Sequence, residues 1–147
     1  MTKVVASNRR ARFDYEIVET MEAGIVLSGQ EVKACRAGQV DLSGAYVSFR
    51  TGVPILRQAT IQPYKRASAL DGYEPGADRP LLLSKKQVEE LRAMSEQDGV
   101  TVLPIEVRAG KYVKVVLAVA RGRKKADKRR AIRDKEVTRA LRRGTEV

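Results

Sequence analysis

The chain has 147 residues, of which 43% are apolar, and a formal net charge of +11 from 29 Lys or Arg and 18 Asp or Glu. This length and composition predict one globular domain, and no apolar run approaches the roughly 18 residues of a membrane span. The chain has no histidine, which excludes Ser-His-Asp and Cys-His mechanisms and removes the commonest metal ligand, so we expect no enzyme and no cofactor.

The first half of the chain has the patterns of strands and one short helix. Partial alternation predicts a strand over residues 13–20, and a second, buried strand follows at 25–27 after a break at 21–24. Gly29 and Gly38 bracket a short helix. Residues 45–50 and 53–61 form a predicted hairpin around Thr51 and Gly52.

The second half begins with a long loop over residues 65–80, which is rich in Gly and Pro. Leu81–Leu83 is then expected to be a core strand. Ser84 and Gln87 form a capping-box pattern that predicts a helix, and Gly99 is its expected stop. Strands are predicted over 100–107 and 112–119 on either side of a turn.

About six short strands with Gly-containing turns and a late helix favour a mainly β fold with helices. An oligonucleotide-binding-type (OB-like) β-barrel, closed or partly open and flanked by short helices, is the natural member of that class. The single cysteine, Cys35, cannot form an intramolecular disulfide and is expected to be a small core residue.

Charge divides the chain into a domain at 1–120 and a basic C-terminal tail at 121–147. The tail holds twelve Lys or Arg against four acids, which is +8 of the total. Such a segment gains most from a polyanion, and nucleic acid is the commonest one. Its apolar residues make a poor stripe, so we expect the tail to be disordered when free and helical on RNA.

Other residues have two readings from the sequence alone. Asn8, Arg9, Arg10 and Arg12 form a second basic cluster that fits a solvated terminus as well as phosphate contacts. Glu22, Glu31 and Lys33 are by type ordinary surface residues. The side chains of Tyr46, Tyr64 and Tyr112 can stack on bases, but packing at the core or its rim is their default role.

Several strings together resemble the SsrA-binding protein (small protein B) family of bacterial trans-translation. They run in order along nearly the whole chain. The two most specific blocks are EAGIVLSGQEVKACRAG at 22–38 and GRKKADKR at 122–129; the others are NRRAR at 8–12, DYEI at 14–17, LSGAYV at 42–47, IQPY at 61–64, LLLSKKQVEEL at 81–91, a G-x-T-x-x-P-like stretch at 99–104, and VKVVLAVAR at 113–121.

The resemblance implies an OB-type barrel that binds the tRNA-like domain of transfer-messenger RNA and accompanies it into stalled ribosomes. It implies a tail that enters the empty mRNA channel of the small subunit at the decoding centre. Elongation factor Tu would be a partner through the RNA, and the protein itself would perform no bond chemistry. We expect a cytoplasmic monomer with no membrane partner; the N-terminus lacks the pattern of a secretory signal.

The family's contact residues carry over by position. Asn8 would hydrogen-bond RNA, Glu22 would accept from base or ribose donors, and Leu82 would contact an unstacked base. The remaining RNA-contacting positions that the basic blocks imply are Arg9, Arg10, Arg12, Lys33, Arg36, Arg123 and Lys124. The tail residues expected at the ribosomal decoding region are Asp127, Lys128, Arg129, Arg130 and Arg133.

Some positions depart from the family pattern. Phe13 stands where the family usually has His, Ser84 where it often has His or Asn, and Ala126 where it often has Tyr or His. The basic segment before the leucines is reduced to Arg79 and Pro80, which removes charge from the 65–80 loop. The main alternative is a general ribosomal protein or RNA chaperone with a basic tail, which would bind many RNAs equally. A metal-dependent nuclease using acids alone comes third.

Overall fold

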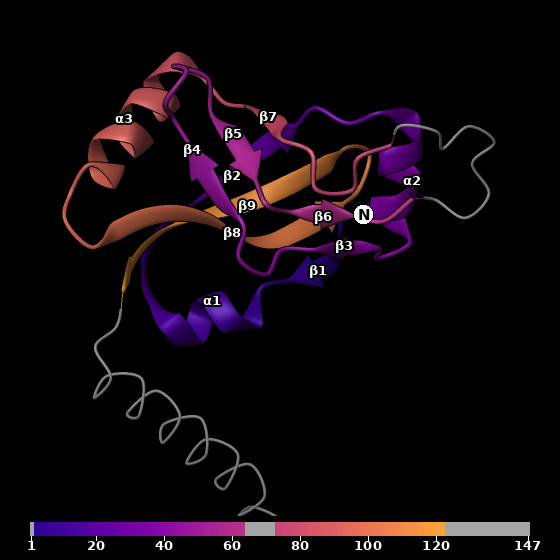
Figure 1. Ribbon diagram of the computed structural model, residues 1–147, viewed down its shortest axis with the longest axis horizontal. Coiled ribbons are helices and arrows are strands. Elements are labelled where there is room, and N and C mark those ends of the chain that lie inside the picture. The colour runs from indigo at the N-terminus through magenta and orange to yellow at the C-terminus, as the bar shows by residue number, and fades with distance from the viewer. Residues whose placement is uncertain (1, 64–72, 123–147) are drawn as a thin grey trace, which may run out of the picture.

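Within residues 2–63 and 73–122, which the computed structural model describes, the chain forms nine strands and three helices (Figure 1). In chain order they are β1 (Lys3–Ser7), α1 (Arg9–Asp14), β2 (Tyr15–Ile25), α2 (Gly29–Arg36), β3 (Val40–Asp41), β4 (Tyr46–Ser48), β5 (Ile55–Arg57), β6 (Thr60–Ile61), β7 (Arg79–Leu82), α3 (Lys85–Ser95), β8 (Val100–Ala109) and β9 (Val113–Gly122).

Seven of these strands form one antiparallel sheet in the order β1-β8-β9-β2-β7-β5-β4, and β3 pairs with β6 in a separate two-stranded sheet. The sheet curls, because its edge strand β4 lies against β8. However, no strand pairing among the described residues joins the two edges, β1 and β4. The mainly β fold with helices is therefore confirmed, whereas a closed barrel is not: the sheet is open.

Apolar side chains pack on both faces of β9. Val113, Val115, Leu117 and Val119 point into the main core, which α2 and α3 help to cover. Val116, Ala118 and Ala120 point the other way, into a smaller cluster that includes Ala11 of α1. A strand buried on both faces reads as a near-continuous apolar run, which is the pattern from 113 to 120.

Both helices predicted from the sequence are confirmed, and their caps explain where they begin. Ser28 and Ser84 each form a complete capping box with the third residue of the helix, Glu31 in α2 and Gln87 in α3. Gly38, with φ of +76°, ends α2 as predicted. α3 instead ends at Ser95, and Gly99 belongs to the turn that leads into β8.

Two strand predictions were wrong in their boundaries. Residues 15–25 form one continuous strand rather than two, because β2 pairs with β9 from Tyr15 to Gly24 and Gly24 lies inside the strand. Residues 13 and 14 belong to α1 instead. The predicted strand at 53–61 is split into β5 and β6 at Gln58, whose φ of 65° is left-handed and interrupts an extended chain.

Cys35 is a core residue, as predicted, with 1% of its surface exposed. Burial raises the pKa of its thiol to about 11, although the positive charge of Arg79 opposes the shift. The thiolate is the reactive form of cysteine, so this side chain is chemically inert at neutral pH.

A buried arginine fastens α2 to the strands beside it. Arg79 is 3% exposed, and its Nε donates to Glu31 Oε2 of α2 at 2.9 Å. Its two Nη atoms donate to the carbonyl oxygens of Ala59 at 3.1 Å, Ala77 at 2.8 Å and Pro75 at 2.9 Å, and to the Tyr73 hydroxyl at 3.5 Å. The sequence suggested that Arg79 is a remaining positive charge of the 65–80 loop. In the structure, its role is to hold α2 and the strands together.

The carboxylate of Glu31 is stabilised in its charged form. Burial alone would raise its pKa, but hydrogen bonds from Ser28 and Arg79, together with the Arg79 charge, lower the pKa below 4.5. The pair therefore adds stability at neutral pH, and this contribution is lost as the pH falls through the folded-state pKa.

We predict that Arg79→Met lowers the free energy of unfolding by about 3–5 kcal/mol, because it leaves the Glu31 carboxylate without its partner. The difference from wild type should narrow in acid, where Glu31 becomes protonated. Urea unfolding across neutral to acidic pH measures both effects. Arg57→Met is the matched control: its ion pair with Asp78 is exposed and should contribute less than about 1 kcal/mol. Equal losses in the two variants would contradict a special role for Arg79.

Candidate nucleic-acid interface

Strand pairing aligns five residues in one row on the outer face of the sheet. Gly24 of β2 lies opposite Leu82 of β7 on one side and Lys114 of β9 on the other. Lys114 lies opposite Arg108 of β8, which in turn lies opposite Val4 of β1. Directly paired residues present their side chains on the same face of a sheet. We call this set, Leu82, Gly24, Lys114, Arg108 and Val4, the cross-strand row.

Leu82 is the apolar end of this row. Its neighbour Leu81 is buried, but 61% of Leu82 is exposed, which differs from the core strand predicted for all three leucines. A groove of about 540 Å³ adjoins it, lined in part by Val88 and the charged residues Lys85, Glu89 and Arg92. An exposed leucine beside a largely apolar groove suits contact with a flat ring system.

Gly24 keeps the middle of the row flat. A Cβ at this position would lie 3.1 Å from the Cβ of Leu82, closer than most packed side chains approach one another. Glycine therefore leaves room for the Leu82 side chain, whose Cβ, Cδ1 and Cγ lie 3.1, 3.4 and 3.6 Å from the place that such a Cβ would take. Leu82 can lie directly against the backbone of β2 at this position.

Glu22 lies one pair further along β2, on the same face, opposite Val116. Its side chain is half-exposed and lies 3.9 Å from Arg108 Nη1. Arg108 also pairs with Glu106 at 3.0 Å, and Glu106 pairs with Arg12 of α1 at 3.4 Å. Glu22 is thus the weakly held end of a chain of ion pairs, with oxygen atoms available to accept hydrogen bonds from a ligand.

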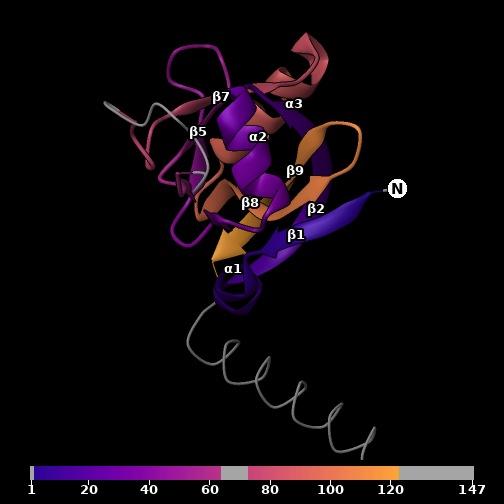
Figure 2. The same ribbon diagram turned by 90° about the vertical axis from the view of Figure 1, so that its right-hand side faces the viewer.

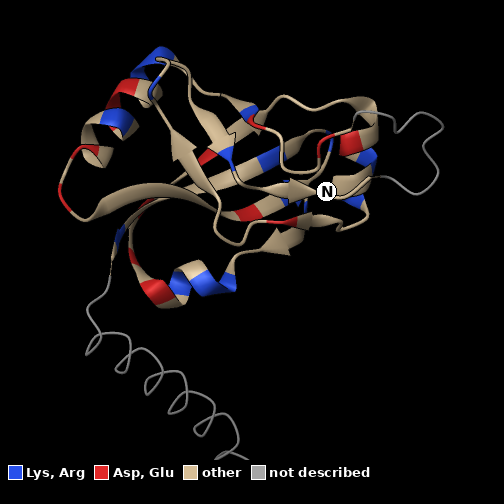
Figure 3. Cartoon of the chain, in the orientation of Figure 1, with Lys and Arg blue, Asp and Glu red and all other residues tan. Residues whose placement is uncertain are grey.

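The predicted contacts of α2 lie at one end of the sheet. Lys33 and Arg36 are both exposed, and Arg36 Nη2 donates to the carbonyl oxygen of Lys111 at 3.3 Å. This bond ties α2 to the turn between β8 and β9. Figure 2, which views the molecule from this end, shows α2 in front of the sheet beside that turn. In Figure 3 this end of the ribbon carries blue Lys and Arg positions next to red Asp and Glu positions.

The N-terminal basic cluster forms α1, and its members lie in different environments. Asn8 is only 6% exposed: its amide donates to Leu42 O at 3.2 Å and Pro104 O at 3.1 Å, and its side-chain oxygen accepts from Ala11 N at 3.1 Å. These bonds commit the side chain to the protein, where it caps α1.

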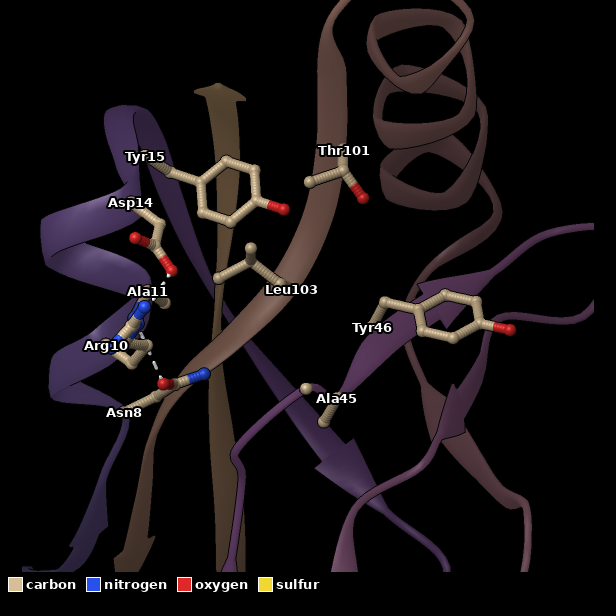
Figure 4. A pocket seen from close by; sticks show the side chains of 10 residues that line it. Asn8, Arg10, Ala11, Asp14, Tyr15, Ala45, Tyr46, Thr101 and Leu103 are labelled. Carbon is tan, nitrogen blue, oxygen red and sulfur yellow. Dashed lines mark hydrogen bonds and ion pairs between the residues drawn. The ribbon is translucent and has the colours of Figure 1, made fainter. Parts of the chain in front are cut away.

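The three arginines of α1, by contrast, are exposed. Arg10 pairs with Asp14 at 3.1 Å, and Arg12 reaches Glu106. Beside α1 lies a hollow of about 390 Å³, which Tyr15, Tyr46 and Leu103 help to line (Figure 4).

The sequence patterns did not single out Lys114 and Arg108, which the structure places on the same face as Leu82 and Glu22, although one signal was present. Lys114 interrupts the apolar run of β9, and alternation places it on the face opposite Val113 and Val115. Its alignment with Leu82, however, depends on pairing across three strands. The predicted tail contacts lie outside the described residues; they are Arg123, Lys124, Asp127, Lys128, Arg129, Arg130 and Arg133.

Over residues 2–63 and 73–122, no group of three or more His, Cys, Asp or Glu side chains is placed to hold a metal ion. None of the helices in these two ranges has the length and apolar character needed to cross a bilayer. The outer face offers two partly exposed cations, Lys114 and Arg108, together with the exposed side chains of Glu22 and Leu82. This combination suits binding rather than catalysis.

Comparison with known proteins gives a consistent picture. The model of the SmpB protein family matches residues 5–146. The SsrA-binding protein of Synechococcus sp. (strain JA-3-3Ab) is 43% identical over 142 residues, which cover 96% of this chain and 92% of that protein. The SsrA-binding protein of Thermus thermophilus is 44% identical over 139 residues, covering 93% of this chain and 96% of that protein.

A solved structure is similar as well. A chain from the structure described as "tmRNA-SmpB: a journey to the center of the bacterial ribosome" superposes with a TM-score of 0.70 at 42% identity, covering 88% of this chain and 94% of the other.

We predict that Asn8→Ala lowers the free energy of unfolding by about 2–4 kcal/mol. The substitution removes a helix cap and leaves two buried carbonyl oxygens without their donor. Thermal or urea unfolding measures the loss. Arg9→Ala, a change at the next residue, which is exposed, should shift stability by less than about 0.5 kcal/mol. An Asn8→Ala variant as stable as wild type would show that this side chain is free to serve elsewhere.

Proposed function

Because the chain belongs to the SmpB protein family, we propose that it binds the tRNA-like domain of transfer-messenger RNA and delivers this RNA to stalled ribosomes in trans-translation. The observation that carries the proposal is the outer face of the sheet. There Leu82 and Glu22, two of the contacts implied by the sequence, lie on one exposed surface together with Lys114 and Arg108.

The chemistry of this face fits an RNA elbow. Folded RNA is recognised through its shape, unstacked bases and 2′-hydroxyl groups. Leu82 supplies an apolar surface for a base, and Glu22 accepts hydrogen bonds from base or ribose donors. Lys114 and Arg108 lie between and beside them, where they attract phosphate. The protein acts by binding and placing RNA, and it performs no bond chemistry.

The remaining basic residues extend this contact. Lys33 and Arg36 of α2 approach phosphates at one end of the sheet. The exposed arginines of α1, Arg9, Arg10 and Arg12, form a separate phosphate contact. Asn8 acts indirectly, by holding α1 in position. We also propose that the curled sheet is an open OB-type barrel; the approach of β4 to β8 supports this.

Within the basic tail, residues 127–147 are proposed to act on the ribosome rather than on transfer-messenger RNA. The tail's density of positive charge suits ribosomal RNA. Arg123 and Lys124 would extend the RNA contact, and Asp127, Lys128 and Arg129, followed by Arg130 and Arg133, would reach the decoding centre and the empty mRNA channel. Elongation factor Tu is a partner through the RNA, and the protein works as a monomer in the bacterial cytoplasm.

We predict that Glu22→Ala weakens binding to the isolated tRNA-like domain by about 10- to 100-fold, the value of a hydrogen bond to a charged group. The free energy of unfolding of this variant should differ from that of wild type by less than about 1 kcal/mol, because the Glu22–Arg108 ion pair is exposed. Filter binding and thermal unfolding measure the two effects.

Glu19→Ala is the matched control for Glu22→Ala. Glu19 is an exposed acid on the same strand but pairs with Val119, whose side chain points to the opposite face, so its affinity should equal that of wild type. Competition with bulk tRNA separates this function from that of a general RNA-binding protein. If bulk tRNA displaces transfer-messenger RNA at equal concentration, the proposed specificity is wrong.

We predict that removing residues 127–147 leaves the affinity for transfer-messenger RNA within about threefold of wild type but abolishes peptide tagging on stalled ribosomes. The described RNA face lies entirely before residue 123, whereas the tail supplies the ribosomal contact. RNA binding and tagging are assayed in parallel with the full chain. Equal losses in both assays would refute this division of tasks.

A further inference from the structure

Tyr112, at the turn between β8 and β9, is the most exposed of the large apolar side chains in the described ranges. Its exposed fraction is 65%, compared with 61% for Leu82 and 54% for Val18. The sequence made packing the default role for this tyrosine, and the structure does not show it packed. An aromatic ring so exposed at the end of a sheet has its face available to a ligand.

The turn that carries Tyr112 is held in place. Gly110 N donates to Tyr112 O at 3.1 Å within the turn. Arg36 of α2 donates to the Lys111 carbonyl oxygen at 3.3 Å. The ring is therefore presented from a turn that is anchored on a helix as well as on two strands.

One cation lies over the ring, and others lie nearby on the same turn and strand. Lys111 Nζ lies 5.7 Å from the centroid of the Tyr112 ring, and Arg36 approaches the same turn. Lys114 follows two residues later on β9 and lies opposite Arg108. The two carboxylates nearby on this face, Glu106 and Glu22, lie within ion-pair distance of Arg108, at 3.0 and 3.9 Å. An aromatic ring among lysines and arginines is complementary to a nucleotide, whose base stacks while its phosphate pairs with the cations.

Tyr112 also adjoins the proposed RNA face. Leu82 and Lys114 are separated by two strand spacings, about 10 Å, and Tyr112 lies two residues, about 7 Å, further along β9. Tyr112 is therefore roughly 12 Å from Leu82, too far for both to contact one base but close enough to contact two bases of one folded RNA.

We propose that Tyr112 is a second base-contacting residue, on which an unpaired base of the bound RNA stacks while Lys111 and Arg36 hold the adjacent phosphates. This inference rests on the proposed function and extends its interface from the cross-strand row to the turn between β8 and β9. Stacking requires the ring rather than the hydroxyl group, and it tolerates any base.

The test measures the affinity of the full-length protein for a fluorescently labelled tRNA-like domain of transfer-messenger RNA. Tyr112→Ala should weaken binding by about 5- to 100-fold, the value of one base–aromatic stack. Tyr112→Phe should retain wild-type affinity, and Tyr112→Leu should lose nearly as much as alanine. The melting temperature should be unchanged, because the side chain is exposed. Val18→Ala, which shortens another exposed apolar residue, should bind as wild type.

Salt dependence separates the ring from the cations. Tyr112→Ala should lower affinity equally at every salt concentration, whereas Lys111→Gln should reduce the slope of log K against log salt by about 0.7–0.9. A Tyr112→Phe variant as weak as Tyr112→Ala would overturn stacking in favour of a contact through the hydroxyl group.

Leu82→Ala distinguishes failure of this inference from failure of the proposed function. If Leu82→Ala weakens binding and Tyr112→Ala does not, the second contact is wrong and the main interface stands. If neither variant weakens binding, the RNA lies elsewhere on the protein and both proposals fall.

Discussion

The register of β9 with its two neighbours is the constraint on which the rest of the structure depends. β9 pairs along its length with β2 and β8 and is buried on both faces. A shift by one residue would turn Lys114 into the core and a valine to the outside. The same pairing that fills the core therefore sets the row from Leu82 to Arg108. Core packing and the proposed RNA-binding face are two results of one alignment.

The charges of this protein serve two different purposes, which burial separates. Arg79 is buried and bonded to Glu31 and to the backbone around it, so its role is to hold α2 in place against the neighbouring strands. Lys111 and the arginines of α1 are exposed, so a polyanion can reach them. A buried arginine is costly unless all its donors are used, and the loop before β7 supplies carbonyl oxygens that satisfy it. From the sequence alone, a buried structural arginine cannot be distinguished from an exposed one that is available to a polyanion.

The helices were predictable because their signals are local. A capping box lies within four residues, and Gly38 marks a stop by its own conformational freedom. The family, and with it Glu22 and Leu82, was also accessible from contiguous strings. The open sheet, the uninterrupted β2 and the place of Lys114 were not, because they depend on pairing between distant segments. Asn8 shows the limit of transferring residues by motif: the string identifies it, but only the structure shows that it is buried.

β9 runs from the turn at Tyr112 to Gly122, the last described residue, which lies opposite Tyr15. Under the proposed function, the length of this strand sets the distance between the turn at Tyr112, where RNA binds, and the start of the basic tail, which reaches the ribosome. Its ten residues correspond to about 33 Å. Lengthening β9 and its two partner strands together by two residues would preserve the register and the face that each side chain occupies, and would increase the span by about 7 Å. The geometry of rescue would thus be set by a strand length, independently of affinity at either end.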